Sequence, residues 1–462
     1  MLLDNIFRHF KYRVINLLRS FEVDRPVVFG LLAKIWALST GLITALLIAT
    51  KLSPEIQGYY FTFATILTLQ AFVELGLGAV IVQFAGHEWG KLSLNETGEI
   101  VGDSEALSRL RSIAKIAIKW YFVGSIVIAL GLSIGGHIFF SNAKHILNIN
   151  WIFPWLSLCL VTGVSICLVP IWSLLEGCNQ VAPLYAFRFY QGVVSSITVW
   201  ISISVGAELW TGTISGLSIL VMSLYFLLRK YYGFLKSIVF GAHNHLISWK
   251  KDILPMQWRM SVASISWFFV YSFFVPIIFK YYGPVMSGQM GLTVGIIMAI
   301  GNLSFSWFTP KIPYFCMLIA EKNYVDLDTL FFHNTKITFK ILLAMSVLFF
   351  IAIHALDQTG LSVAKRLLPP STATIFLAAY FVGFASAPFS HYMRAHKKEP
   401  IVLVTFFGAV FTGIATYITG KYYTIDYMAV SYLIVNTIMT CCIIVIWHFN
   451  RLKWQGKNKS WH

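Results

Sequence analysis

Apolar residues run along this chain in long stretches separated by short polar segments. Twelve such stretches occupy residues 27–50, 59–86, 116–140, 151–175, 184–205, 209–228, 256–279, 285–308, 336–355, 372–391, 401–419 and 427–449. About 20 apolar residues cross the hydrocarbon core of a bilayer as a helix. A backbone inside lipid must satisfy its own hydrogen bonds, and no segment alternates in polarity like a barrel strand. The pattern predicts an all-α polytopic membrane protein with about twelve transmembrane helices.

A short motif recurs halfway along the chain. Pro54 and Gly58 stand between the first and second predicted spans, and Pro284 and Gly288 stand 230 residues later between the seventh and eighth. An offset of half the chain indicates a repeat of six spans. Because six is an even number, the two halves would insert with the same orientation and form two six-helix lobes.

The predicted lobes occupy residues 27–228 and 256–449, with a linker over residues 229–255. Residues 1–26 carry apolar side chains at helical spacing and basic side chains on the other faces. This pattern predicts an amphipathic helix that lies on the headgroups of one leaflet. Residues 450–462 form a basic tail.

Composition and charge support a membrane location. Hydrophobic residues make up 57% of the chain and charged residues 12%, with a mean hydropathy of +0.72, whereas soluble domains carry about 25% charged residues. Of the 35 basic residues, 23 fall on one side of the predicted spans and six on the other. The positive-inside rule therefore places both termini in the cytoplasm. The net charge of +16 reflects this topology, so we expect no nucleic-acid partner.

The sequence carries no motif that would hold a cofactor or a metal. The six cysteines lie mostly within apolar stretches and lack metal-ligand spacing. None of the Gly-Lys pairs is followed by the Ser or Thr of a phosphate-binding loop. We expect neither a cofactor nor a metal ion.

Ionisable residues within the predicted spans are the first candidates for function. Each costs about 2.5 to 3.5 kcal/mol in lipid unless it faces a partner or water. Lys34 in the first span and Glu74 in the second lie at similar depth, so they either neutralise each other or face a transport cavity. Gln70, one helical turn before Glu74, is a further polar candidate for that cavity.

A polar stripe follows one face of the fifth span. Its members are Arg188, Gln191, Ser195, Thr198 and Ser202. A stripe that runs the length of a span is costly against lipid and predicts a hydrated lumen. Arg259 in the seventh span and Lys119 in the third stand near the cytoplasmic ends, where the alternative is that they reach the headgroups.

Span eight has one face of small residues. These are Gly288, Gly291, Gly295, Ala299, Asn302 and Ser306. Close helix packing explains such a face, and exposure of Asn302 to a cavity is the alternative. Four prolines inside spans are candidate bending points, namely Pro154, Pro170, Pro276 and Pro388.

Several stretches resemble the polysaccharide transporter family. They are Gly58-Tyr-Tyr-Phe-Thr-Phe, Glu74-Leu-Gly-Leu-Gly, Ile253-Leu-Pro-Met-Gln-Trp-Arg-Met-Ser-Val, Val275-Pro-Ile-Ile-Phe-Lys-Tyr-Tyr-Gly-Pro and Ile319-Ala-Glu-Lys-Asn-Tyr-Val-Asp-Leu-Asp. That family holds bacterial flippases for O-antigen and other lipid-linked oligosaccharides. It lies within the multidrug/oligosaccharidyl-lipid/polysaccharide (MOP) exporter superfamily, together with the multidrug and toxic-compound extrusion (MATE) transporters.

The resemblance implies a MATE-like fold of two six-helix lobes around a central cavity that opens alternately to each side of the bacterial inner membrane. The cargo would be an oligosaccharide on undecaprenyl pyrophosphate, moved outward for surface polysaccharide or lipopolysaccharide synthesis. Polymerase and chain-length machinery would be partners. Candidates for binding the pyrophosphate are Lys34, Arg188 and Arg259. The other polar or coupling candidates are Glu74, Gln70, Gln191, Ser195 and Asn302.

Three other functions are alternatives. An ion-coupled antiporter for drugs or cations should have a net acidic cavity. A membrane polymerase or ligase needs a large external loop for its catalytic groups, and the predicted external loops are short. A purely structural subunit would not need charged residues within its spans.

Overall fold

The computed structural model describes residues 25–142, 149–239, 254–396, 398 and 400–455. Side chains of some helical residues, Lys34 and Arg259 among them, are outside this description. The predicted interfacial helix over residues 1–26 also lies almost wholly outside it. Within the described part, the chain is helical apart from one β-hairpin and short connections.

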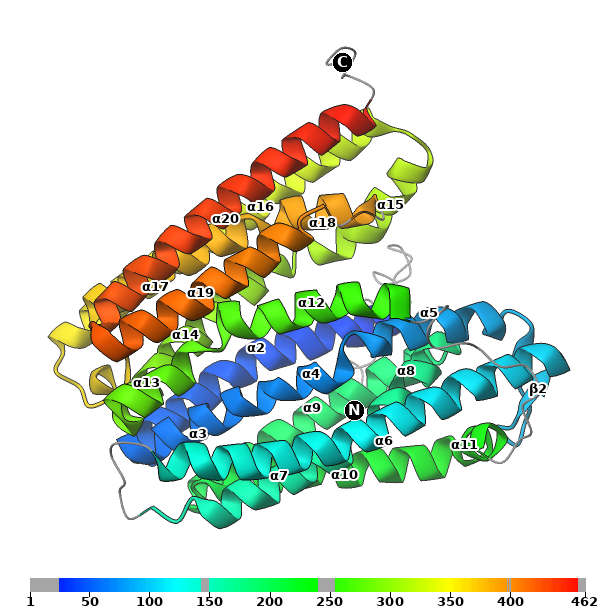
Figure 1. Cartoon of the computed structure of the whole chain (residues 1–462), viewed down its shortest axis with the longest axis horizontal. Coiled ribbons are helices and arrows are strands. Elements are labelled where there is room, and N and C mark those ends of the chain that lie inside the picture. Colours follow the sequence, from blue (N-terminus) through cyan, green and yellow to red (C-terminus); the bar gives the residue numbers. More distant parts are fainter. Residues whose placement is uncertain (1–24, 143–148, 240–253, 397, 399, 456–462) are drawn as a thin grey trace, which may run out of the picture.

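The first lobe, here called the N lobe, contains the first six predicted spans (Figure 1). Its helices are α2 (Arg25–Lys51), α3 (Pro54–Leu67), η1 (Thr68–Gln70), α4 (Ala71–Glu74), α5 (Leu77–Trp89), α6 (Ser104–Ser141), α7 (Ile152–Ile166), α8 (Val169–Gly177), α9 (Val181–Ser204) and α10 (Trp210–Lys230). Strands β1 (Leu92–Leu94) and β2 (Ile100–Gly102) pair antiparallel between α5 and α6. Helix α11 (Tyr232–Val239) begins the predicted linker.

The second lobe, the C lobe, contains the last six predicted spans. Its helices are α12 (Leu254–Tyr271), α13 (Phe274–Tyr282), α14 (Pro284–Phe305), η3 (Thr309–Lys311), α15 (Ile312–Ala320), α16 (Tyr324–Gln358), η4 (Ala364–Arg366), α17 (Pro370–Ala385), α18 (Ala387–Ala395), α19 (Val402–Tyr422) and α20 (Ile425–Trp454). Each of the twelve predicted spans therefore lies in one helix or in consecutive helices.

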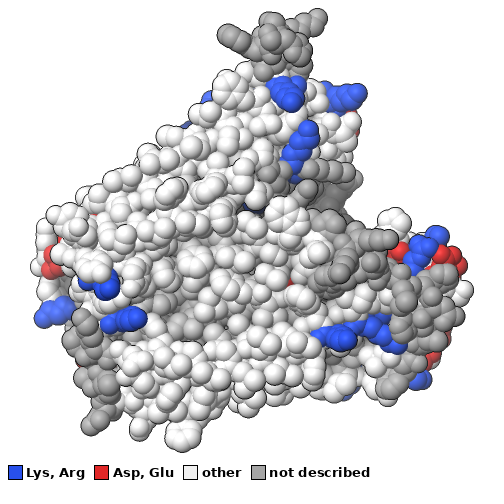
Figure 2. All heavy atoms as spheres, viewed as in Figure 1, with Lys and Arg blue, Asp and Glu red and all other residues white. Residues whose placement is uncertain are grey.

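Among the described residues, eight helices are long and apolar enough to cross a membrane, and two bent pairs raise this number to ten. Helices α2 and α9 lie at the two remaining predicted spans. Large apolar side chains on the outer surface are exposed, as on α6, where Val127 is 63% and Ile134 is 60% accessible. Figure 2 shows the charged side chains of one face near the two ends, with a broad uncharged belt between them. Such a belt suits contact with lipid.

Two helices begin well before the spans predicted for them. The third and ninth spans were expected from residues 116 and 336, but α6 begins at Ser104 and α16 at Tyr324. The Asp103 side chain accepts a hydrogen bond from the Ala106 backbone N–H at 2.8 Å, and Asn323 caps α16 in the same way. The apolar residues of a span show only which part of the helix contacts lipid. The helix itself can extend beyond the lipid into water, where a side chain caps its first turn.

Four of the spans are interrupted. The fourth, seventh and tenth each divide into two helices, and the second divides into α3, η1, α4 and α5. Pro170 and Pro388 stand in the first turns of α8 and α18, and Pro276 stands in the first turn of α13. Pro154 also lies in a first turn, that of α7, where proline is tolerated without a bend. The second span bends by 43° without any proline, because Leu75 and Gly76 adopt left-handed conformations with φ of 43° and 70°.

The lobes meet at one end of the molecule and diverge toward the other (Figure 1). At the end that we call closed, α3 of the N lobe packs against α13 and α14 of the C lobe. The opposite end, which we call open, carries the β-hairpin, α11, α15 and α18 (Figure 1). On one face α12 leans across and contacts α4 and α5.

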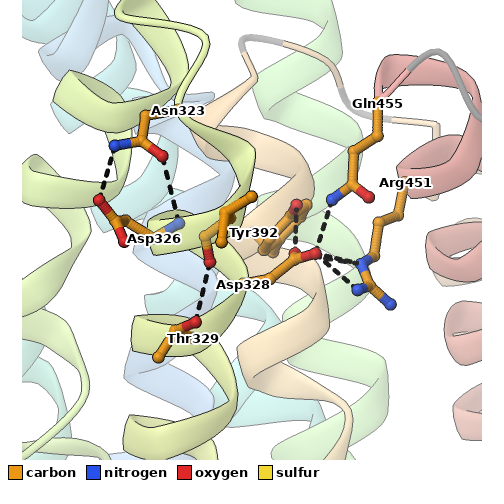
Figure 3. A network of polar contacts seen from close by, with 8 residues as sticks. Asn323, Asp326, Asp328, Thr329, Tyr392, Arg451 and Gln455 are labelled. Atoms are coloured by element: carbon orange, nitrogen blue, oxygen red, sulfur yellow. Dashed lines mark hydrogen bonds and ion pairs between the residues drawn. The ribbon is translucent and has the colours of Figure 1, made fainter.

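A polar network joins three helices of the C lobe near the open end (Figure 3). Asp328 of α16 accepts hydrogen bonds from the Arg451 guanidinium of α20 at 2.6 and 3.1 Å. It also accepts from the Tyr392 hydroxyl of α18 at 3.2 Å and from the Gln455 amide at 2.8 Å. Asp328 therefore fixes α16, α18 and α20 to one another.

Replacing Asp328 with asparagine should lower the stability of the protein by about 2 to 3 kcal/mol. This value is below the 3 to 5 kcal/mol of a fully buried pair, because the Arg451 and Asp328 side chains stay 19% and 16% exposed. Thermal unfolding of the purified full chain tests it. The matched control is Glu105→Gln, which removes an ion pair to Arg109 whose members are 50% and 46% exposed. That change should cost less than about 0.5 kcal/mol, and an equal loss for both variants would contradict the prediction.

The imidazole of His396 lies beside this network. Its ring stacks on Trp454 with centroids 4.0 Å apart. Burial, together with the charge of Lys398, lowers the pKa of His396 to about 4, against the opposing effect of Asp328. An unfolded histidine has a pKa of about 6.5.

Stability should therefore fall as the pH drops from about 6.5 toward 4, because only the unfolded chain gains this proton over that range. His396→Phe keeps a ring between its neighbours and removes the titration. We expect its melting temperature to fall less than that of the unsubstituted protein between pH 7.5 and 5.5. Equal decreases in the two proteins would show that His396 does not contribute.

Candidate functional site

A cavity of about 920 Å³ lies between the two lobes. Its walls come from α2, α3, α9 and α14, so both lobes contribute. The volume lies in the upper part of the roughly 300 to 1,000 Å³ range of small-molecule sites. We call it the central cavity.

The lining of the central cavity is mostly apolar, with polar side chains placed along its length. Phe61, Leu292 and Ile48 line the part near the contact of α3 with α14. Arg188 and Asn302 line the part toward the open end, with Ser306 and Thr309 beyond them along the chain. A ligand with an apolar portion and a charged or hydroxylated portion would match this mixed lining.

Arg188 is the one charged residue among the described residues that line the central cavity. Its guanidinium makes an ion pair with Glu176 of α8, at 3.3 Å between Nη2 and Oε2, and lies 5.7 Å from the Tyr185 ring centroid. The side chain stays 44% exposed. Arg188 therefore remains accessible to an anionic ligand.

The predicted polar stripe of the fifth span divides between two environments. Arg188 and Ser195 line the central cavity, together with Gly192 and Ser196, which the stripe did not include. The amide of Gln191 donates to the Ser223 hydroxyl of α10 at 2.9 Å, and the Ser195 hydroxyl also lies 3.0 Å from the Ser215 hydroxyl of α10. The face of α9 that lines the cavity therefore contains Arg188, Gly192 and Ser195, which are spaced by about one helical turn. Gln191 connects α9 to α10.

The small-residue face of α14 packs closely against the N lobe along one half of the helix and lines the central cavity along the other half. A methyl group on Gly288 would lie 2.9 Å from the backbone N of Gly58, and one on Gly291 would lie 2.5 Å from the Phe61 side chain. Asn302, with Gly295, Ala299 and Ser306, lines the central cavity. Close packing therefore explains the half near the closed end, and the cavity explains the other.

The two repeated motifs are in direct contact at the closed end. A methyl group on Gly58 would lie 1.9 Å from the carbonyl oxygen of Pro284. The Gln57 amide donates to the Gly288 carbonyl at 2.9 Å, and Thr62 and Ser287 hydroxyls are 2.9 Å apart. Arg366, at the end of η4, donates to the Leu52 carbonyl at 2.6 Å. These contacts seal the cavity at this end.

Glu74 and Gln70 lie in the bent second span and are not among the described residues that line the central cavity. Their neighbours contact other elements. The Trp120 indole of α6 donates to the Val73 carbonyl at 2.9 Å, and the Ser261 hydroxyl of α12 donates to the Leu75 carbonyl at 3.1 Å.

Two of the predicted cationic residues, Lys34 and Arg259, lie in described helices. Lys34 lies in α2 and Arg259 in α12, but both side chains are outside the described part of the structure. The residues Ala33 and Ala37, on either side of Lys34 in α2, line the central cavity. The predicted pairing of Lys34 with Glu74 therefore stays a prediction.

A second cavity of about 280 Å³ lies within the C lobe, between α12, α14, α17, α18, α19 and α20. It shares Asn302 and Phe305 with the central cavity, and Arg394 and His391 also line it. The sequence reading missed this site because it placed Arg394 in a cytoplasmic loop over residues 392–399. From the sequence alone, a basic residue at the end of an apolar segment looks the same whether it lies in a loop or lines a cavity.

No group of three or more His, Cys, Asp or Glu side chains suited to a metal ion occurs among the described residues. All six cysteines are free.

No protein-family model matches the chain, and no curated protein is significantly similar to it in sequence. Solved structures match it over most of its length. An inward-facing structure of a multidrug resistance MATE family transporter of the MOP superfamily has a TM-score of 0.62 and 15% identity, over 94% of this chain and 96% of that one. An outward-facing structure with the same description has a TM-score of 0.51 and 12% identity, over 94% and 98%.

A third structure is that of a MOP superfamily transporter from Pyrococcus furiosus, with a TM-score of 0.51 and 13% identity over 94% of this chain and 96% of that one. Its description states that a reversed polarity of the binding pocket suggests a different function. These similarities confirm the predicted fold class. The chain is an all-α, multi-pass membrane protein with the fold of the MATE transporters of the MOP superfamily.

Proposed function

We propose that this protein is an alternating-access flippase that moves a polyprenyl-pyrophosphate-linked oligosaccharide outward across the bacterial inner membrane. The observation that carries the proposal is the central cavity, which lies between two lobes and has Arg188 as its one described charged lining residue. A pyrophosphate is an anion that a guanidinium binds through charge-assisted hydrogen bonds.

The orientation of the cavity supports the proposed direction of transport. The open end carries the segments that the positive-inside rule assigns to the cytoplasm, including α11 and the β-hairpin. A precursor assembled on the cytoplasmic leaflet would therefore meet the open end. The higher TM-score to an inward-facing structure than to an outward-facing one agrees with this state.

The mixed apolar and polar lining of the cavity suits a lipid-linked cargo. Arg188 and Asn302 would meet the pyrophosphate and the first sugar, while the prenyl chain would stay in lipid between the diverging lobes. Undecaprenyl pyrophosphate is the carrier that we propose, with polymerase and chain-length machinery acting on the exported product.

A multidrug or cation antiporter is the alternative that the similar structures suggest. A cation binds best where carboxylates line the site, and no carboxylate is among the described lining residues of the central cavity. Polarity of the pocket is also the feature on which a different function was suggested for the Pyrococcus furiosus transporter. The same criterion favours an anionic cargo for this chain.

A binding competition distinguishes the two functions. The purified full chain in lipid nanodiscs would be titrated with geranylgeranyl pyrophosphate, with uncharged geranylgeraniol and with the lipophilic cation tetraphenylphosphonium. We expect the pyrophosphate to bind at least tenfold more tightly than the alcohol, since a charge-assisted contact contributes about 1.5 to 3 kcal/mol. Preferential binding of the cation would favour the antiporter instead.

A further inference from the structure

We propose that the smaller cavity in the C lobe, which we call the C-lobe chamber, is a carbohydrate-binding subsite that holds a sugar of the cargo. This inference rests on the proposed function, because it places the saccharide beside a pyrophosphate bound in the central cavity. The chamber is defined by Ser386, Ser390, Arg394, Thr405, Asn436 and Thr440, with aromatic side chains on its wall.

The hydroxyl groups of the chamber present acceptors to a ligand. Ser386 and Ser390 donate to the Gly383 and Ser386 carbonyls at 2.8 and 3.3 Å. Thr405 donates to the Val402 carbonyl at 2.9 Å, and Thr440 to the Val382 carbonyl at 3.1 Å. A hydroxyl has one proton and two lone pairs. Each of these protons is used within the protein, so the oxygen atoms remain as acceptors for a ligand rich in O–H groups.

Donors line the chamber beside these hydroxyls. Arg394 of α18 lines it with an exposed side chain, and a guanidinium carries five N–H donors and no acceptor. His391 adds a ring nitrogen, and Asn436 adds an amide that already donates one hydrogen bond to the Tyr432 carbonyl at 3.0 Å. No Asp or Glu is among the described residues that line the chamber. A polyol, whose hydroxyls both donate and accept, complements this set better than a cation or a hydrocarbon.

Aromatic rings supply the apolar wall that a sugar ring needs. Trp267 and Tyr271 of α12 line the chamber with ring centroids 4.1 Å apart, and Phe384 of α17 lines it as well. Trp267 is 53% exposed. Such amphipathic side chains offer an apolar face beside polar groups, as ligand sites commonly do.

The chamber and the central cavity are neighbours at one point on α14. Asn302 and Phe305, one turn apart, line both cavities. We infer that the saccharide of a ligand held by Arg188 reaches the chamber beside Asn302. The volume of about 280 Å³ lies close to the lower limit of about 300 Å³ for small-molecule sites, so the chamber would take a small part of the saccharide rather than the whole cargo.

The double substitution Ser390→Ala and Thr405→Val tests the chamber. Both hydroxyls bond carbonyls of their own helix, so their loss should leave the fold intact. The matched control is Thr437→Val on α20, whose exposed hydroxyl bonds the Leu433 carbonyl at 2.8 Å in the same way but does not line the chamber. Melting temperatures of the variants show whether each one folds.

The measurement compares two probes on the full chain in nanodiscs, geranylgeranyl pyrophosphate and the same lipid carrying a disaccharide. The unsubstituted protein should prefer the disaccharide form, and the double variant should lose about tenfold in affinity for it without a change for the bare lipid. Arg394→Gln should act in the same selective way.

Three results would overturn the inference. If the double variant keeps the full preference, the sugar does not lie in the chamber. If the unsubstituted protein binds both lipids equally, the pyrophosphate site stands and the chamber does not hold a sugar. If it binds neither lipid, the proposed function fails together with the chamber.

Discussion

Replacing Gly58 with valine is expected to stop the lobes from closing at the closed end and to shift the protein toward the opposite conformation. A methyl group at this position already meets the Pro284 carbonyl oxygen at 1.9 Å. Both groups belong to backbone that is packed on each side, so the contact has no flexible side chain to move away. Overpacking typically costs about 1 to 3 kcal/mol, which corresponds to a 5- to 150-fold change in a two-state equilibrium.

Double electron–electron resonance between spin labels at Glu96 and Val325 measures the separation of the lobes at the open end. Gly58→Val should shorten this distance and lower the transport rate more than tenfold. The matched control is Gly131→Val on α6, where nothing lies within 4 Å of an added methyl group. Unchanged distances in Gly58→Val would mean that the contact between α3 and α14 does not govern the conformation.

Replacing Arg188 with glutamine should weaken binding of a prenyl pyrophosphate by about 10- to 150-fold. The reason is the loss of a charge-assisted hydrogen bond, which contributes about 1.5 to 3 kcal/mol. Arg188→Lys should keep part of the affinity, because it retains the charge without the planar fork of donors. Isothermal titration with geranylgeranyl pyrophosphate gives the dissociation constants.

Glu176→Gln should have the opposite effect. It removes the carboxylate that pairs with Arg188 at 3.3 Å, so the guanidinium would bind an anion more tightly by up to about fivefold, the range of exposed ion pairs. The control is Arg229→Gln on α10, which removes a cation outside the central cavity. Equal losses in Arg188→Gln and Arg229→Gln would indicate that only the overall charge of the protein attracts the ligand.

The hydrophobic pattern was sufficient to predict the fold class. Each predicted span lies in helical structure, since backbone in lipid has few alternatives to a helix. The pattern did not predict where helices end. Asp103 and Asn323 cap α6 and α16 beyond the lipid-facing part, and the apolar content of a span contains no information about those polar turns.

The repeat was predicted from two short motifs, but their contact was not. Pro54 with Gly58 and Pro284 with Gly288 indicated two equivalent halves. That Gly58 and Gly288 touch each other follows from the way the halves dock, which is a tertiary property. The bend at Leu75 and Gly76 was also not predicted, because a left-handed leucine has no sequence signature.

Only part of the candidate site was predicted, because the rest also depends on tertiary contacts. A polar residue within a span indicates that it avoids lipid, but not which neighbour it faces. Arg188 and Asn302 face the central cavity, whereas Gln191, on the same predicted stripe as Arg188, bonds Ser223 of α10. Arg394 was read as a loop residue, although α18 carries it to the wall of the C-lobe chamber.

Transbilayer movement of the cargo is the most direct test of the proposed function. The full chain would be reconstituted in vesicles with a fluorescent polyprenyl-pyrophosphate-linked oligosaccharide, and a membrane-impermeant quencher would report its arrival in the outer leaflet. We expect movement well above that in protein-free vesicles, and a decrease of at least tenfold in Arg188→Gln. No movement of this lipid, together with uptake of tetraphenylphosphonium under an imposed ion gradient, would contradict the flippase and identify a cation antiporter.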